Sequence, residues 1–200
     1  MAAMTVSMDN FGARYAAACE TNGYRVEMIT TANIDSMLKP LLRHWVQNLN
    51  QGRFPDHIYY FRDGVSEGQF QHVLQQEVGD MRKMITGVHP TWEGKFIVIV
   101  ASKRHHIRFF PGSAGDRNGN PHPGTLVERD VTHPFEYDFY LNSHSAIQGT
   151  ARPVHYHVLI DEIGLDANKL QKMIYEHSYQ YMRSTTPVSL CKSAIPLLGE

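Results

Sequence analysis

The stretch "IYYFRDGVSEGQF", Ile58–Phe70, joins a short apolar run to a helix start through Arg-Asp-Gly. The run His57–Phe61 is aromatic and β-branched, which predicts a buried strand. The tetrapeptide Ser66–Gln69 has the S-x-x-Q pattern of a capping box, and apolar residues at helical spacing follow it as far as Ile85. Asp63 thus lies between a strand and a helix. Two interpretations of Asp63 and Gly64 are open. They form an ordinary turn, or Asp63 is a metal-binding carboxylate at the edge of a sheet.

Two further helices are predicted on either side of this stretch. Residues 33–49 carry apolar side chains at helical spacing, with Asn33 as the expected N-cap. Pro40 conflicts with a continuous helix, since a proline in a helix interior removes a hydrogen bond. A third helix is predicted from Asp166 to Arg183.

Buried strands alternate with these helices. "FIVIV", Phe96–Val100, is unbroken and predicts a strand buried on both faces. "VHYHVLI", Val154–Ile160, predicts another strand, whereas residues 111–125 are rich in Gly, Pro, Asn and Asp and predict a loop. The alternation indicates an α/β layered fold, in which sites gather at the carboxyl ends of strands.

Composition narrows the class of protein. A chain of 200 residues with 42% apolar and 20% charged residues fits one ordinary globular domain. The formal net charge of −1 gives no global attraction to nucleic acid or membrane, so a polyanion site must be a local patch. Two cysteines, Cys19 and Cys191, argue against a disulfide scaffold and favour an intracellular compartment. No apolar run approaches the length that spans a membrane.

Three basic or histidine-bearing clusters are candidates for binding. Lys103–His106 with Arg108 follows the strand "FIVIV" and is either a solvated strand end or a phosphate contact. The segment "NSHSAIQGTARP", residues 142–153, places polar and basic side chains among small residues. The third cluster is Tyr181 with Arg183, although the helix dipole alone also favours an arginine at a helix end.

His155 and His157 are two residues apart on a predicted strand and therefore share a face. That spacing suits a pair of zinc ligands, but further ligands are not obvious from the sequence. The alternative is two histidines packed or hydrogen bonded within the sheet.

Long phrases in this chain resemble the Piwi domain of eukaryotic Argonaute proteins. They are "YFRDGVSEGQF", "KRHHIRFFP", "PGTLVERDVTHPFEYDFYLNSHSAIQGTARPVHYHVL" and "LQKMIYEHSYQYMRSTTPVS", in family order. The resemblance covers residues 6–190, so we expect residues 1–190 to form a partial Piwi domain and residues 191–200 to be a divergent tail. It implies an α/β fold of the RNase H-like kind, a mixed sheet with flanking helices. It also implies a small guide RNA, a complementary target RNA, a MID domain packed alongside, and a cytoplasmic or nuclear location.

The resemblance also implies a site. The family cleaves target RNA with Mg²⁺ ions held by carboxylates, and Asp63 matches its second catalytic aspartate and metal ligand. Glu27, in "RVEMI", matches the glutamate that completes the ligand set. The positions that match family contacts to guide phosphates and riboses are Lys103, Arg104, His144, Arg152, Tyr181 and Arg183.

Departures from the family pattern bear on activity. The strand with the first catalytic aspartate, expected before "VSMDNFGARYA", and the C-terminal helix are absent, as is the last catalytic residue. We therefore expect the mixed sheet to lack its first, central strand and RNA cleavage to be absent. The alternatives are a non-catalytic RNA-binding module and a gene fragment with no independent function.

Overall fold

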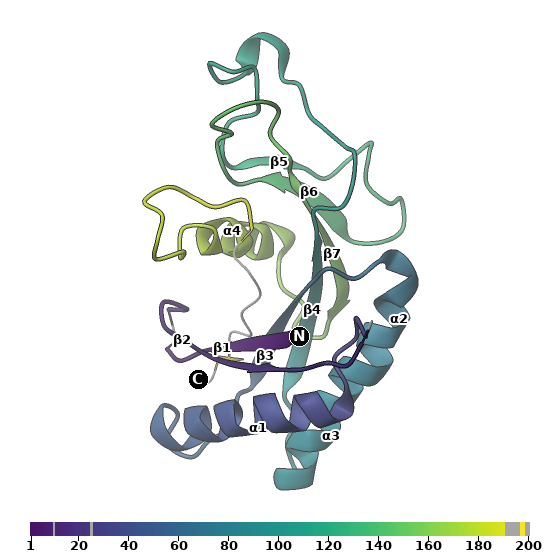
Figure 1. Ribbon diagram of the computed structural model, residues 1–200, viewed down its shortest axis with the longest axis vertical. Coiled ribbons are helices and arrows are strands. Elements are labelled where there is room, and N and C mark those ends of the chain that lie inside the picture. Colours follow the sequence, from purple (N-terminus) through teal and green to yellow (C-terminus); the bar gives the residue numbers. More distant parts are fainter. Residues whose placement is uncertain (10, 25, 191–196, 199–200) are drawn as a thin grey trace.

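The computed structural model describes residues 1–9, 11–24, 26–190 and 197–198 (Figure 1). Six strands form a mixed sheet in the order β5-β6-β7-β4-β3-β8, and two more form a separate antiparallel pair. The strands are β1 (Ala2–Ser7), β2 (Tyr15–Glu20), β3 (His57–Asp63), β4 (Lys95–Ser102), β5 (Thr125–Val127), β6 (Asp138–Asn142), β7 (Val154–Asp161) and β8 (Leu197–Leu198). The helical elements are α1 (Thr31–Asn48), η1 (Glu67–Gln69), α2 (Phe70–His72), η2 (Val73–Val78), α3 (Gly79–Val88), η3 (Gly112–Ala114) and α4 (Ala167–His177).

Strand β4 is the centre of the large sheet. It pairs parallel with β3 and antiparallel with β7, and the side chains of Phe96–Val100 are fully buried. The unbroken apolar run is required because helices cover both faces. The prediction of a strand buried on both faces is confirmed.

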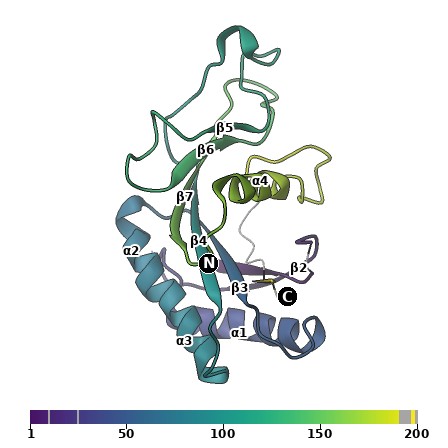
Figure 2. The same cartoon turned by 180° about the vertical axis from the view of Figure 1, so that it is seen from behind.

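The two faces of the sheet carry separate cores. Helices α1 and α3, together with η2, pack over one face, whereas α4 packs on the other. Figure 1 and Figure 2 show α4 on the opposite side of the β3-β4-β7 strands from α3, with β5 and β6 at the far end of the molecule. This arrangement confirms the mixed α/β sheet with flanking helices.

The pair β1-β2 belongs to the first core but not to the large sheet. Met4 and Val6 of β1 are buried with α1, while within the described ranges neither strand is hydrogen bonded to β3. No helix follows α4 in the described part of the chain.

Helix α1 begins earlier than predicted. Thr30 is its N-cap, and the Thr30 side chain accepts a hydrogen bond from the backbone N–H of Asn33 at 3.2 Å. Asn33 is therefore inside the helix, and its prediction as N-cap is wrong. Pro40 does not end α1, because buried side chains on both sides of it, Met37 and Trp45 among them, hold the helix on the core.

The predicted capping box is confirmed, since the Gln69 side chain accepts a hydrogen bond from the Ser66 N–H at 2.9 Å. The helical run that follows is not regular, because η2 is a π-helix that places Glu77 in the core. Helix α4 begins at Ala167, directly after its N-cap Asp166, and ends at His177. The prediction that this helix reaches Arg183 is wrong.

No helix within the described residues is both long and apolar enough to cross a membrane. The expectation of a divergent tail at residues 191–200 falls outside the described residues, except for the backbone of β8.

Candidate nucleic-acid interface

Asp63 is the last residue of β3, where the parallel strands β3 and β4 end side by side. It pairs in register with Ala101, so Lys103 and Arg104 follow β4 at the same edge. Gly64 has φ +80°, a backbone conformation that residues other than glycine rarely adopt. It turns the chain sharply after Asp63. A cavity of about 640 Å³ opens here, lined by Glu27, Asp63, Gly64, Val65, Ser66, Gln69, Ser102, Lys103, Arg104, Ser189 and Leu190. The structure thus brings together four of the predicted site residues.

Glu27 is held at this cavity by neighbours on two elements. Its carboxylate accepts a hydrogen bond from the Gln69 amide at 3.0 Å, and its backbone carbonyl accepts one from the Arg62 guanidinium at 2.8 Å. The capping residue Gln69 therefore links the helix start to the loop that carries Glu27.

Arg62 is itself fixed by Glu77. The two side chains form a salt bridge of 2.9 Å, with Glu77 fully buried and Arg62 14% exposed. The carboxylate also accepts hydrogen bonds from the Tyr60 hydroxyl at 2.7 Å and the Ile29 N–H at 2.9 Å. Burial opposes the charge of Arg62, but the hydrogen bonds to Glu77 hold its pKa above the ordinary value.

This buried network was not predicted from the sequence. The signal was present, because Glu77 falls on the apolar face of the predicted helix, four residues from both Val73 and Met81. A carboxylate at such a position requires a buried partner.

Basic side chains lie on the other side of the cavity. The Lys103 ammonium donates to the Ser189 hydroxyl at 2.6 Å. Burial lowers the pKa of Lys103 and the charge of Arg152 lowers it further, while Asp63 opposes the shift. Burial and the charge of Lys103 also lower the pKa of His144. Lys103 is therefore close enough to both Arg152 and His144 for their charges to interact.

No ion pair within the described residues includes Lys103, Arg104 or Arg152. The like charges of Lys103 and Arg152 repel each other, and the nearby charge of Asp63 offsets part of that repulsion.

Tyr181 and Arg183 do not line the Asp63 cavity. Both are exposed on the segment after α4, and no described contact brings either side chain to the cavity. The segment does return to the site, because the carbonyl groups of Val188 and Ser189 accept hydrogen bonds from the Ser143 hydroxyl. Ser189, which sequence analysis did not single out, thus joins this segment to Lys103.

The family of this chain is decided by its match to known proteins. A family model described as the Piwi domain matches residues 1–194. The chain belongs to the Piwi domain family. It is 43% identical over 194 residues to Protein argonaute 3 of Oryza sativa subsp. japonica and 41% identical over 192 residues to Protein argonaute of Schizosaccharomyces pombe. Each alignment covers 95% of this chain but only 17% and 22% of those relatives.

Solved structures of related proteins support the same family assignment. The chain superposes on a crystal structure of Kluyveromyces polysporus Argonaute with a guide RNA at a TM-score of 0.81 and 31% identity, covering 92% of this chain and 23% of that one. Against Drosophila Piwi the TM-score is 0.66 at 28% identity, covering 78% and 21%. The fold is therefore that of the Argonaute Piwi domain.

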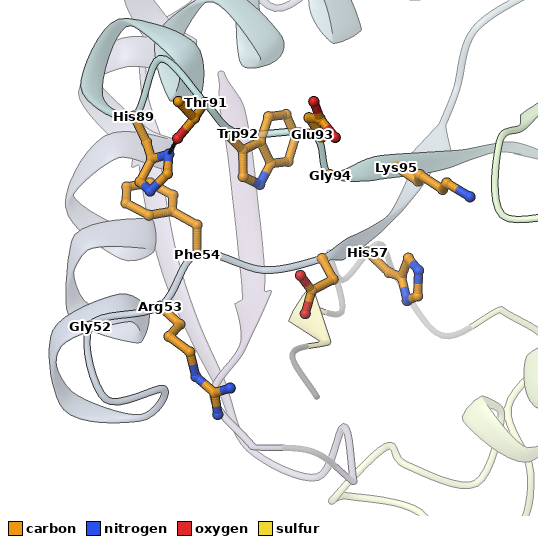
Figure 3. Close-up of a pocket in the computed structure, with 11 residues that line it drawn as sticks. Gly52, Arg53, Phe54, His57, His89, Thr91, Trp92, Glu93, Gly94 and Lys95 are labelled. Atoms are coloured by element: carbon orange, nitrogen blue, oxygen red, sulfur yellow. Dashed lines mark hydrogen bonds between the residues drawn. The ribbon is translucent and has the colours of Figure 1, made fainter.

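The Piwi domain has a second cavity, of about 510 Å³, at the opposite end of β3 and β4. Phe54, His57, Trp92 and Lys95 are among its lining residues, and Figure 3 shows His89 hydrogen bonded to Thr91 at its rim. None of the predicted site residues lines it.

The donors at the Asp63 cavity suit a hard cation, since carboxylate and hydroxyl oxygens are what Mg²⁺ prefers. They do not fit a centre of two metal ions. Asp63 and Glu27 are the acidic residues that line the cavity, and a group of three ligand side chains is found in the described residues only at Asp138, His155 and His157. Two carboxylates compensate only half of the positive charge of two divalent ions.

Proposed function

We propose that this Piwi domain chain binds single-stranded RNA through the edge of the sheet at Asp63, as part of an RNA-guided silencing protein. The observation that carries the proposal is the group of Lys103, Arg104 and Arg152 at one strand edge without a carboxylate in an ion pair with any of them. Phosphate oxygens supply the missing negative charge. Lys103 and the arginines donate to those oxygens, and His144 accompanies them as a neutral imidazole at pH 7, because its pKa is lowered.

The partners follow from the relationship to Argonautes, one of which was solved with a guide RNA. We infer a small guide RNA, a complementary target RNA and a MID domain as partners, in the cytoplasm or nucleus. Tyr181 and Arg183 extend the proposed RNA contacts along the segment that returns to Lys103.

RNA cleavage is not part of the proposal for this chain. Asp63 and Glu27 are proposed to hold one hydrated Mg²⁺ ion, which neutralises phosphate charge when bound. Incubation of the chain with a guide, a complementary RNA and Mg²⁺ is expected to give no specific product. Specific products that disappear in Asp63→Ala would contradict this expectation.

The substitution Lys103→Met tests RNA binding. Removing one phosphate contact is expected to weaken binding of a short 5′-phosphorylated RNA by about tenfold or more, because hydrogen bonds to charged groups contribute roughly 1.5–3 kcal/mol. The slope of log affinity against log salt should also decrease in magnitude by about 0.7, the value for one phosphate on a single strand. Fluorescence anisotropy over a series of salt concentrations measures both.

Lys169→Met is the matched control, since Lys169 is exposed on α4 and does not line the cavity. It should leave the affinity and the slope unchanged. RNA binding by Lys103→Met with the affinity and slope of the parent chain would show that the proposed site is wrong.

A further inference from the structure

We propose that Asp138, His155 and His157 form a binding site for one divalent transition-metal ion, zinc foremost, on the sheet face beside α2. The three residues lie outside the Asp63 cavity, and the inference does not depend on RNA binding. One ligand atom from each residue lies within 4.8 Å of the others.

Strand register creates the group. His155 and His157 are two residues apart on β7 and point to one face, and Asp138 pairs with His157 across the ladder to β6. The two imidazole rings are 3.9 Å apart between centroids. Because all three residues belong to paired strands, their backbones are fixed before any ion binds.

The side chains are withdrawn from water. The Asp138 side chain is 1% exposed and that of His155 13%, while His157 as a residue is 7% exposed. The Nδ1 atom of His157 is buried and has no hydrogen-bond partner. Buried polar atoms nearly always have a partner, so His157 has a ring nitrogen whose bonding capacity no described residue uses.

Neighbouring groups hold the proposed ligands in place. Asp138 Oδ1 accepts a hydrogen bond from the His133 N–H at 2.8 Å, which orients the carboxylate. The Tyr140 ring stacks on His155 at 4.0 Å, and Phe70 packs 5.1 Å from His157. Such outer contacts orient metal ligands and sustain their affinity.

The donor set selects the ion. Two imidazole nitrogens and one carboxylate oxygen suit Zn²⁺, which takes four ligands and would complete its shell with water. Mg²⁺ and Ca²⁺ prefer oxygen and are disfavoured here.

The competing arrangement is a hydrogen-bonded pair without metal. His155 Nε2 lies 2.5 Å from Asp138 Oδ2, a contact that a bound ion would have to replace. A metal titration distinguishes the two arrangements, because only the proposed site requires all three residues.

The test uses the whole chain, treated with a chelator and then titrated with Zn²⁺ against a chromogenic competitor. Co²⁺ serves as a second probe, because a four-coordinate site gives visible d–d absorption. We expect one ion per chain. Asp138→Asn and His157→Asn should each weaken the zinc affinity by at least about 10–100-fold, the loss caused by removing even an outer partner of a ligand.

His44→Asn is the matched control, since His44 is exposed on α1 outside the group, and it should keep the affinity of the parent chain. Circular dichroism of the metal-free variants checks that each is folded, and Asp138→Asn keeps the side-chain volume. A parent chain that binds neither ion, or one that binds as tightly as the folded Asp138→Asn and His157→Asn variants, overturns the proposal.

Discussion

At the scale of single residues, the main effect of Asp63 comes from its position beside Lys103, where its charge acts on the basic cluster. The residue ends a strand beside Lys103, and its charge raises the pKa of that lysine against the effects of burial and Arg152. One carboxylate thus balances part of a basic cluster. In the described part of the chain it does not belong to a group of three metal-ligating side chains.

This balance predicts the effect of Asp63→Asn on RNA binding. Without Mg²⁺ the carboxylate repels phosphate, so its removal should strengthen binding by about 1.5–5-fold, the factor expected from 0.2–1 kcal/mol for an exposed charge pair. Anisotropy in the presence of EDTA measures the change. The substitution Asp56→Asn, remote from the cavity, is the control. Weaker binding by Asp63→Asn in EDTA would mean that the carboxylate does not face the bound phosphates.

At the scale of elements, the Arg62–Glu77 pair connects β3, η2 and the loop of Glu27. Glu77→Gln should lower the free energy of unfolding by about 3 kcal/mol or more, because it leaves the Arg62 charge buried without its partner. The double variant Arg62→Met with Glu77→Met should lose much less, since neither charge remains. Urea unfolding measures both. Equal losses in the single and double variants would show that packing, and not charge, is what Glu77 contributes.

The elements also show what the sequence could predict. Phe96–Val100 is apolar throughout, so strand β4 could be predicted from the sequence. The start of η1 could also be predicted, because a capping box precedes it. Strand β1, "AAMTVS", is weak in β-branched residues, and β6, "DFYLN", is short and ends in polar residues that are buried only by their neighbours. Both strands were missed for that reason.

The candidate sites depend on strand register, which we could not predict from the sequence. Lys103 and His144 come together only because residues from separate loops meet at one end of the sheet. Asp138 joins the histidine pair only through the ladder between β6 and β7. The resemblance to Argonautes brought Glu27 and Asp63 into consideration, but their support by Gln69 and Arg62 required the structure.

At the scale of the whole molecule, half-buried histidines make the fold sensitive to acid. Burial lowers the pKa of His144 and His177 below the ordinary 6.5. Below that pH the unfolded chain takes up protons that the folded chain does not. Stability should therefore be fully present above pH 6.5 and fall as the pH drops towards the lowered pKa values.

Urea unfolding in EDTA at about pH 7.5 and about pH 5.5 tests this expectation. The midpoint should be higher at the higher pH, and the difference should shrink in His177→Gln. His44→Gln should not change it, since His44 is exposed on α1. If the His177→Gln variant shows the same difference between the two midpoints as the parent chain, the loss of stability in acid comes from other groups and the prediction is wrong.

The two-sheet arrangement also has a consequence for the order of assembly during synthesis. Strands β1 and β2 and helix α1 are consecutive in the chain and pack on one another, so all of their mutual contacts lie within the first 48 residues to be synthesised. Strand β4 requires neighbours from both directions, and β7 ends only at Asp161. The most deeply buried strand of the molecule is therefore also among the last to gain both of its partners.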